Sequence, residues 1–89
     1  MSQVVNNPEE LDAFANQMLS FLETLKDATN SLNQSFGTLG DSWQDEKRVA
    51  FEEDYNELLN VLNQFENNSL EKVEYLKIKA SQLREYLGS

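Results

Sequence analysis

The sequence predicts an all-α protein: a two-helix antiparallel hairpin that dimerises into a four-helix bundle. Three observations support this fold class. The 89 residues are mostly good or tolerated helix formers, with one Pro and three Gly. Two long stretches repeat apolar residues every three or four positions. Two glycines interrupt the pattern near its middle, so we expect one domain over residues 1–89, with a helix over 8–39, a turn over 40–42 and a helix over 43–87.

The first helix has a clear start. Asn7 suits the N-cap, Pro8 suits the first helical position, and Glu10 stands three residues after the cap, as in a capping box. A heptad-spaced apolar row follows, formed by Leu11, Met18, Leu25, Leu32 and Leu39. Phe14 and Phe21 fall between these residues at the same three-four spacing, and Ala15, Leu19 and Leu22 widen the stripe beyond one strict seam. A stripe this broad predicts that the helix packs against more than one neighbour.

The break between the helices contains Gly37 and Gly40, which suit a helix C-terminus. We expect Asp41 or Ser42 to cap the second helix. The second apolar pattern then runs in threes and fours through Phe51, Tyr55, Leu58, Leu62, Phe65, Ser69, Val73, Leu76, Ala80, Leu83 and Leu87. It predicts one long helix, or two helices with a weak joint at residues 67–69.

A single hairpin is too thin to cover both apolar stripes. Exposed apolar patches of several hundred Å² are rare on soluble monomers, so we expect a homodimer, or a heterodimer with a similar small helical protein. The expected dimer interface consists of Phe14, Met18, Phe21, Leu22, Leu25, Leu32, Tyr55, Leu58, Leu62 and Phe65.

The expected helices differ in length, at about 48 Å and about 67 Å for a rise of ~1.5 Å per residue. A hairpin folded at Gly40 would bring Leu11 near the low seventies and leave the residues after about 76 without an intramolecular neighbour. Residues 70–89 also carry four bases and three acids, against three bases and thirteen acids before them. We therefore expect this end to dock a partner through Leu76, Lys79, Leu83 and Leu87.

Composition excludes several classes of function. The formal net charge of −9 opposes binding to nucleic acid or to an anionic membrane surface. The absence of Cys and His removes thiolate metal sites and the commonest general base. No apolar stretch is long enough to insert into a membrane, and the N-terminus lacks a signal-peptide pattern, so any export must avoid a cleaved signal peptide. We expect no enzyme activity and no cofactor.

Two features admit a second interpretation. The acidic run Glu52-Glu53-Asp54 resembles a set of metal ligands, but on a helix its carboxylates point in three directions, which favours a solvated face. Trp43 lies at the turn, where a hairpin core is thinnest. It is either a plug for the end of the bundle or a recognition element, and the two roles are compatible.

The turn resembles that of the WXG family, small helical hairpins related to the early secreted antigens of type VII (ESX) secretion. The resemblance rests on Trp43 in a short turn between two long helices, with Ala50 and Phe51 at the family's spacing after it. The family's Gly two positions after the Trp is Asp45 here. Many members also carry a Tyr followed four positions later by an acid, whereas here Tyr75 is followed by Lys79.

The resemblance implies a four-helix bundle made of two hairpins, exported through a membrane complex that an FtsK/SpoIIIE-like ATPase drives. The expected function is that of a small secreted substrate or targeting partner of a type VII system, cytoplasmic before export and secreted without a cleaved signal peptide. In that case we expect a partner to supply the missing signal. The alternative is a cytoplasmic helical adaptor or chaperone for a larger effector, not itself exported.

Overall fold

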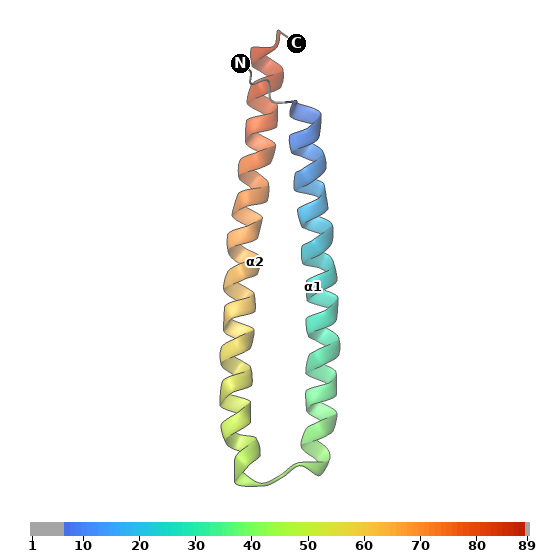
Figure 1. Cartoon of the computed structure of the whole chain (residues 1–89), viewed down its shortest axis with the longest axis vertical. Coiled ribbons are helices and arrows are strands. Elements are labelled where there is room, and N and C mark those ends of the chain that lie inside the picture. The colour runs from blue at the N-terminus through green and yellow to red at the C-terminus, as the bar shows by residue number, and fades with distance from the viewer. Residues whose placement is uncertain (1–6, 89) are drawn as a thin grey trace.

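The computed structural model describes residues 7–88 and confirms the all-α hairpin. Helix α1, Pro8–Ser42, and helix α2, Glu46–Tyr86, run antiparallel, and the end of α2 extends past the start of α1 (Figure 1). They form a rod of 65 × 20 × 17 Å, and the described residues contain no strand. The start of α1 and the end of α2 lie at one end of the rod, and the turn lies at the other (Figure 1).

Helix α1 starts as the sequence predicts and continues past the predicted end. The Asn7 side chain accepts a hydrogen bond from the Glu9 backbone N–H at 2.9 Å, and Pro8 occupies the first turn. Two acids in this turn complement the positive end of the helix dipole. The helix then runs through both of its glycines to Ser42, where the Trp43 N–H bonds to the carbonyl of Leu39 at 2.9 Å.

The connection between the helices is the three residues Trp43, Gln44 and Asp45. Asp45 is the N-cap of α2, because its carboxylate accepts hydrogen bonds from the backbone N–H groups of Lys47 and Arg48 at 3.0 and 3.2 Å. The expectation that Asp41 or Ser42 caps this helix is wrong, since both lie in α1. Helix α2 is continuous, with no joint at residues 67–69.

The hairpin core is a narrow seam between the two helices. Its most buried apolar side chains are Ala15 and Leu22 from α1, and Tyr55, Val73 and Ala80 from α2. The seam residues recur every three or four positions on each helix, which is the spacing of lengthwise helix packing. Ala15 and Ala80 are completely buried in the seam, whereas no large side chain of the described residues is completely enclosed.

The register of the two helices differs from the expectation at the terminal end. Arg84 bonds to Asp12, and Lys77 bonds to Asn16 at 2.9 Å, so the start of α1 lies beside residues 77–84. The expectation that residues beyond about 76 lack an intramolecular neighbour is wrong. The chain turns around Gln44 rather than Gly40. When the turn moves along the chain by one residue, the residue of α2 that lies opposite a given residue of α1 moves by two positions.

Candidate interaction surface

One face of the rod exposes a row of large apolar side chains from both helices. Phe14, Phe21 and Leu32 of α1, and Leu58 and Phe65 of α2, are between 45% and 56% exposed. We call these five residues the apolar face. The rings of Phe21 and Phe65 meet edge to face across the seam, with centroids 6.3 Å apart. This contact places the exposed rows of α1 and α2 on the same side of the hairpin.

A shallow groove runs along the apolar face beside this aromatic pair. Phe14, Met18, Phe21 and Phe65 line it, with Leu22 and Ser69 at its floor. Carbon surface therefore predominates in the groove, with one amide, that of Gln17, in its lining. A groove of this composition fits apolar side chains of another helix better than a polar ligand.

The ten residues expected at a dimer interface fall into two groups, one exposed on the apolar face and one lying in the seam between the helices. The five residues of the apolar face are exposed, whereas Leu22 and Tyr55 are buried within the hairpin. Met18, Leu25 and Leu62 are half-buried along the seam. Both groups follow helical spacing, so periodicity alone could not separate the residues that hold the hairpin from those available to a neighbour.

An aromatic cluster closes the turn end of the hairpin. Half-buried Trp43 stacks at a tilt on Phe51, with centroids 5.7 Å apart. Phe51 in turn contacts Phe36 at 5.9 Å, and Phe36 contacts Tyr55 at 4.6 Å. Trp43 thus covers the end of the core, as a plug does, while Phe51 is 45% exposed. Ala50, the other residue of the expected turn motif, is exposed and absent from these ring contacts.

Arg48 completes this end of the core, a role that the sequence did not reveal. Its guanidinium lies over the ring of Phe36 at 5.7 Å and within 3.8 Å of the Glu52 carboxylate. It also occupies the space that a side chain at position 40 would need, since a Cβ at Gly40 would lie 2.6 Å from the guanidinium nitrogen. Gly40 therefore allows Arg48 to lie between the helices.

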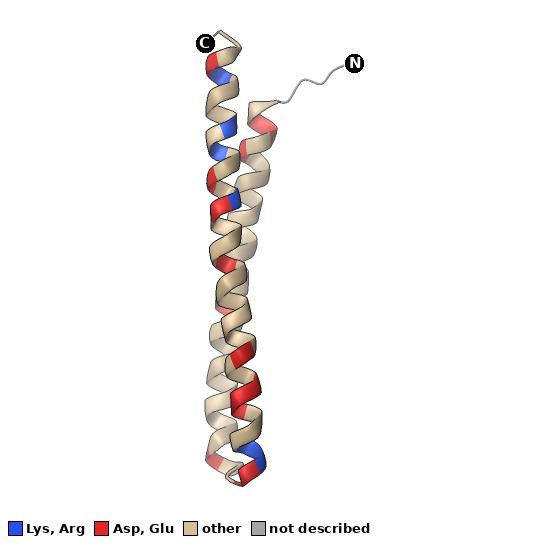
Figure 2. Ribbon diagram, turned by 90° about the vertical axis from the view of Figure 1, so that its left-hand side faces the viewer, with Lys and Arg blue, Asp and Glu red and all other residues tan. Residues whose placement is uncertain are grey.

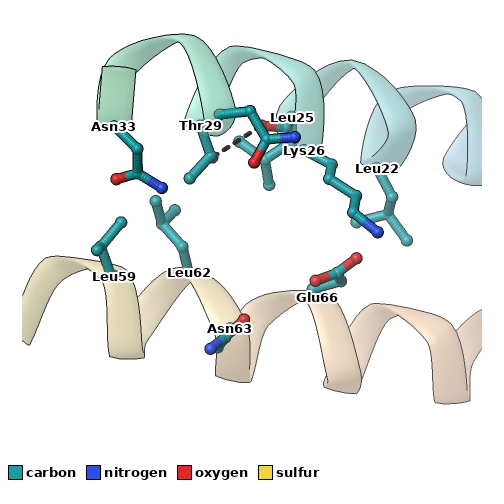
Figure 3. Close-up of a pocket in the computed structure, with 10 residues that line it drawn as sticks. Leu22, Leu25, Lys26, Thr29, Asn33, Leu59, Leu62, Asn63 and Glu66 are labelled. Atoms are coloured by element: carbon teal, nitrogen blue, oxygen red, sulfur yellow. Dashed lines mark hydrogen bonds between the residues drawn. The ribbon is translucent and has the colours of Figure 1, made fainter. Parts of the chain in front are cut away.

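The opposite face of the hairpin is polar at its middle. Figure 3 shows the groove there, in which the side chains of Lys26 and Glu66 point toward one another and Asn33 faces α2. The hydroxyl of buried Tyr55 donates a hydrogen bond to the Asn33 side-chain oxygen. We call this side the polar face; it offers amide and charged groups where the apolar face offers rings and leucines.

The terminal end is held by a polar cluster around Asp12. Its carboxylate bonds to Arg84 and lies 3.8 Å from the Lys77 ammonium. The hydrogen bond from Arg84 lowers the pKa of Asp12 below its usual value, and the positive charges of Arg84 and Lys77 act in the same direction. The sequence shows that opposite charges are present near both termini. Which of them form ion pairs depends on how α1 and α2 are aligned, and the structure shows that alignment.

Of the residues expected to dock a partner, two contribute to the hairpin itself. Leu76 and Leu83 are half-buried and line a second groove with Leu11 and Lys79. Leu87, by contrast, is 57% exposed at the very end of α2. Two exposed tyrosines, Tyr75 and Tyr86, also line this groove.

Charge is distributed unevenly along the rod. Figure 2 shows acidic residues over the half of α2 nearer the turn, and basic residues concentrated toward its C-terminal end. The bases of that end are Lys72, Lys77, Lys79 and Arg84. Lys47 and Arg48 lie at the turn among the acids. In the described residues no helix is long and apolar enough to cross a membrane, and no cluster of three or more potential metal ligands occurs.

The family model for proteins of 100 residues with WXG matches residues 3–86 of the chain. The chain is also similar to YfjA of Bacillus subtilis, an uncharacterized protein, with 31% identity over 71 residues that cover 80% of this chain and 68% of YfjA. An uncharacterized protein of Clostridium acetobutylicum is 31% identical over 67 residues, covering 75% of this chain and 70% of that protein. No solved structure matches the chain.

Proposed function

The chain belongs to the WXG100 family, and we propose that it is a small secreted substrate or targeting partner of a type VII (ESX-like) secretion system. It acts in this proposal through a four-helix bundle formed with a second hairpin. The observation that carries the proposal is the apolar face, which this hairpin leaves exposed along the rod.

The energetics of the apolar face support a bundle. Five large side chains that are about half exposed leave several hundred Å² of apolar surface in water, which is unusual for a soluble monomer. Burial stabilises by roughly 25 cal/mol per Å² of apolar surface. A second hairpin laid along this face supplies long helices of the same spacing, so the two surfaces fit without any change of fold.

The turn fits the proposed family role despite its departure from the motif. Asp45 stands where the family has Gly, and its carboxylate caps α2 through two backbone hydrogen bonds. The side chain therefore contributes to the turn instead of disturbing it. Trp43 stays partly accessible beside Phe51, and we propose these two rings as a recognition surface for the secretion ATPase or for a larger effector.

Export in this proposal uses the folded bundle and no cleaved signal peptide. The protein is cytoplasmic before export and neither inserts into a membrane nor binds nucleic acid. The FtsK/SpoIIIE-like ATPase or a larger effector is the proposed partner, and the exposed end of α2 at Leu87 is retained as a docking position. No catalytic step and no cofactor enter the proposal.

A specific observation favours the alternative, a cytoplasmic adaptor or chaperone for a larger effector. Tyr75 is followed four positions later by Lys79, where many exported members carry an acid. The ammonium of Lys79 lies over the Tyr75 ring at 5.9 Å, so the two residues form a basic aromatic site instead of an acidic one. An adaptor would escort an effector that carries the signal.

The test compares the culture supernatant with the cell lysate, in strains with and without the secretion ATPase. Secretion that requires the ATPase supports the proposed function, and retention of all the protein in the lysate supports the adaptor. The variant Phe21→Ser with Phe65→Ser should lose both the dimer and export. Leu70→Ser is the matched control, because Leu70 is similarly exposed on α2 but lies outside the apolar face.

A further inference from the structure

The groove on the polar face lies away from the surface on which the proposed bundle forms. Its volume of about 240 Å³ is below the roughly 300 to 1,000 Å³ of typical small-molecule pockets. Most of its polar lining side chains are exposed. A groove of this kind suits a segment of chain that lies along it better than it suits an enclosed ligand.

The groove is about as long as a short extended peptide. Its lining runs from Leu22 to Asn33 on α1 and from Leu59 to Glu66 on α2. At a rise of ~1.5 Å per residue, these stretches measure about 16 Å and about 10 Å. An extended chain advances ~3.3 Å per residue, so roughly three to five of its residues span the groove.

The groove has an apolar floor between two polar edges. The floor consists of four leucines that are buried or half-buried, Leu22, Leu25, Leu59 and Leu62. Lys26 on the α1 edge and Glu66 on the α2 edge point toward one another (Figure 3). Asn30 lies one turn after Lys26 on α1. Because α2 runs in the opposite direction, Asn63, one turn before Glu66, faces Asn30 across the groove.

The asparagines of the groove have hydrogen-bonding groups to spare. In the part of the chain that the structure describes, neither Asn30 nor Asn63 has a side-chain hydrogen bond. The side-chain oxygen of Asn33 accepts the bond from Tyr55, which leaves the two N–H donors of its amide for another acceptor. The hydroxyl of Thr29, by contrast, already donates to the Leu25 carbonyl at 2.8 Å. The polar groups available to a ligand are therefore chiefly amides.

An asparagine amide matches the backbone of an extended peptide. It donates from its nitrogen and accepts at its oxygen, so it pairs with both the N–H and the C=O of one residue. In an extended chain these two groups point to one side, and those of the next residue point to the other side. Two facing asparagines therefore hold two successive residues, while every second side chain points to the floor. A helical segment has its backbone groups bonded internally and cannot use the amides in this way.

We propose that this groove binds an extended peptide segment of another protein, held by backbone hydrogen bonds to Asn30 and Asn63 with an apolar side chain on the leucine floor. Lys26 and Glu66 continue the pattern, since an ammonium donates to a carbonyl and a carboxylate accepts from an N–H. Lys26 lies ~6 Å along α1 from Asn30, close to the ~6.6 Å between alternate residues of an extended chain. The peptide leaves the apolar face free, so a second hairpin can bind at the same time.

A nuclear magnetic resonance titration of the ¹⁵N-labelled full chain tests this site. The probe is acetyl-Ser-Leu-Ser-Leu-Ser-amide, which is uncharged and too short to form a stable helix. We expect saturable shifts of the side-chain amide signals of Asn30, Asn33 and Asn63, with a Kd on the order of 1 mM. The same peptide with methylated leucine backbone nitrogens should bind about tenfold more weakly, because it lacks N–H groups that the amides accept.

A double variant and its matched control locate the binding. Asn30→Ala combined with Asn63→Ala removes both facing amides and should weaken binding about tenfold, read from the Asn33 signal. Asn60→Ala combined with Asn67→Ala is the control, because both are exposed asparagines of α2 that do not line the groove. The control should bind the probe as the unmodified chain does. Circular dichroism checks that both variants keep their helices.

Each contrary result overturns the proposal. If the amide signals show no saturable shift at roughly 10 mM probe, the groove does not bind an extended peptide. If the methylated peptide binds equally well, docking uses the leucine side chains and not the backbone. If the Asn30 and Asn63 double variant binds as well as the unmodified chain, or if the shifts centre on Phe21 and Phe65, the peptide lies outside the groove.

Discussion

Replacing Trp43 by Ala should destabilise the hairpin without unfolding it. Trp43 is half-buried and stacks on Phe51, so the substitution removes about 100 Å² of buried apolar ring surface, worth ~2.5 kcal/mol at about 25 cal/mol per Å². The aromatic contact adds up to ~1 kcal/mol, and relaxation of Phe51 returns part of it. The expected loss of unfolding free energy is therefore about 2 to 3 kcal/mol.

The measurement is a thermal melt followed by circular dichroism at one fixed protein concentration, because dimer formation makes the midpoint depend on concentration. For a chain of this length the loss corresponds to a midpoint lower by roughly 10 to 20 °C. Trp43→Phe is the matched control, since it keeps a ring on Phe51, and should lie within ~1 kcal/mol of the original chain. A Trp43→Ala midpoint within experimental error of the original chain would refute the plug role.

Three further changes test other parts of the hairpin. Leu22→Ala, in the seam, should cost about 2 to 4 kcal/mol in chemical unfolding, and a loss below 1 kcal/mol would contradict its burial. Gly37→Ala should stabilise by roughly 0.5 to 1 kcal/mol, because a Cβ there meets nothing within 4 Å, whereas Gly40→Ala should gain less since a guanidinium lies 2.6 Å from its Cβ. Asp12 has a lowered pKa in the folded state, so its contribution is present above its unfolded pKa of about 4 and is lost as pH falls through the folded value. The stability gap between the original chain and Asp12→Asn should thus be full at pH 7 and shrink under strong acid; a gap independent of pH would argue against the bond to Arg84.

The sequence predicted the helices well because their signals are local. Asn7 and Pro8 mark the start of α1, and three-four spacing marks the length of both helices. The end of α1 was placed too early because glycine in a helix costs ~1 kcal/mol, which makes Gly37 and Gly40 resemble a terminus. Packing offsets that cost here, since Gly40 admits Arg48 between the helices.

The candidate interaction surface was only partly predictable from the sequence, because it depends on which face of α1 packs against which face of α2. Leu22 and Phe21 are adjacent in sequence and both fit an apolar stripe, yet one is buried in the hairpin and the other is exposed. Moving the turn from Gly40 to Gln44 shifts the facing residues by about eight positions. That shift gave Arg84 a neighbour in Asp12 and removed the expected unpaired segment.

The narrow seam also determines how the rod opens. Every contact between α1 and α2 closes a loop around the same turn: Tyr55 lies 22 positions after Asn33, and Arg84 lies 72 positions after Asp12. Once the inner contacts exist, each outer one closes only a short additional loop, so the hairpin zips from the turn outward and frays from the other end. Amide protons near Asp12 and Arg84 should therefore exchange with solvent sooner than those near Asn33 and Tyr55. The free energy of local opening then rises along the hairpin from its terminal end to its turn.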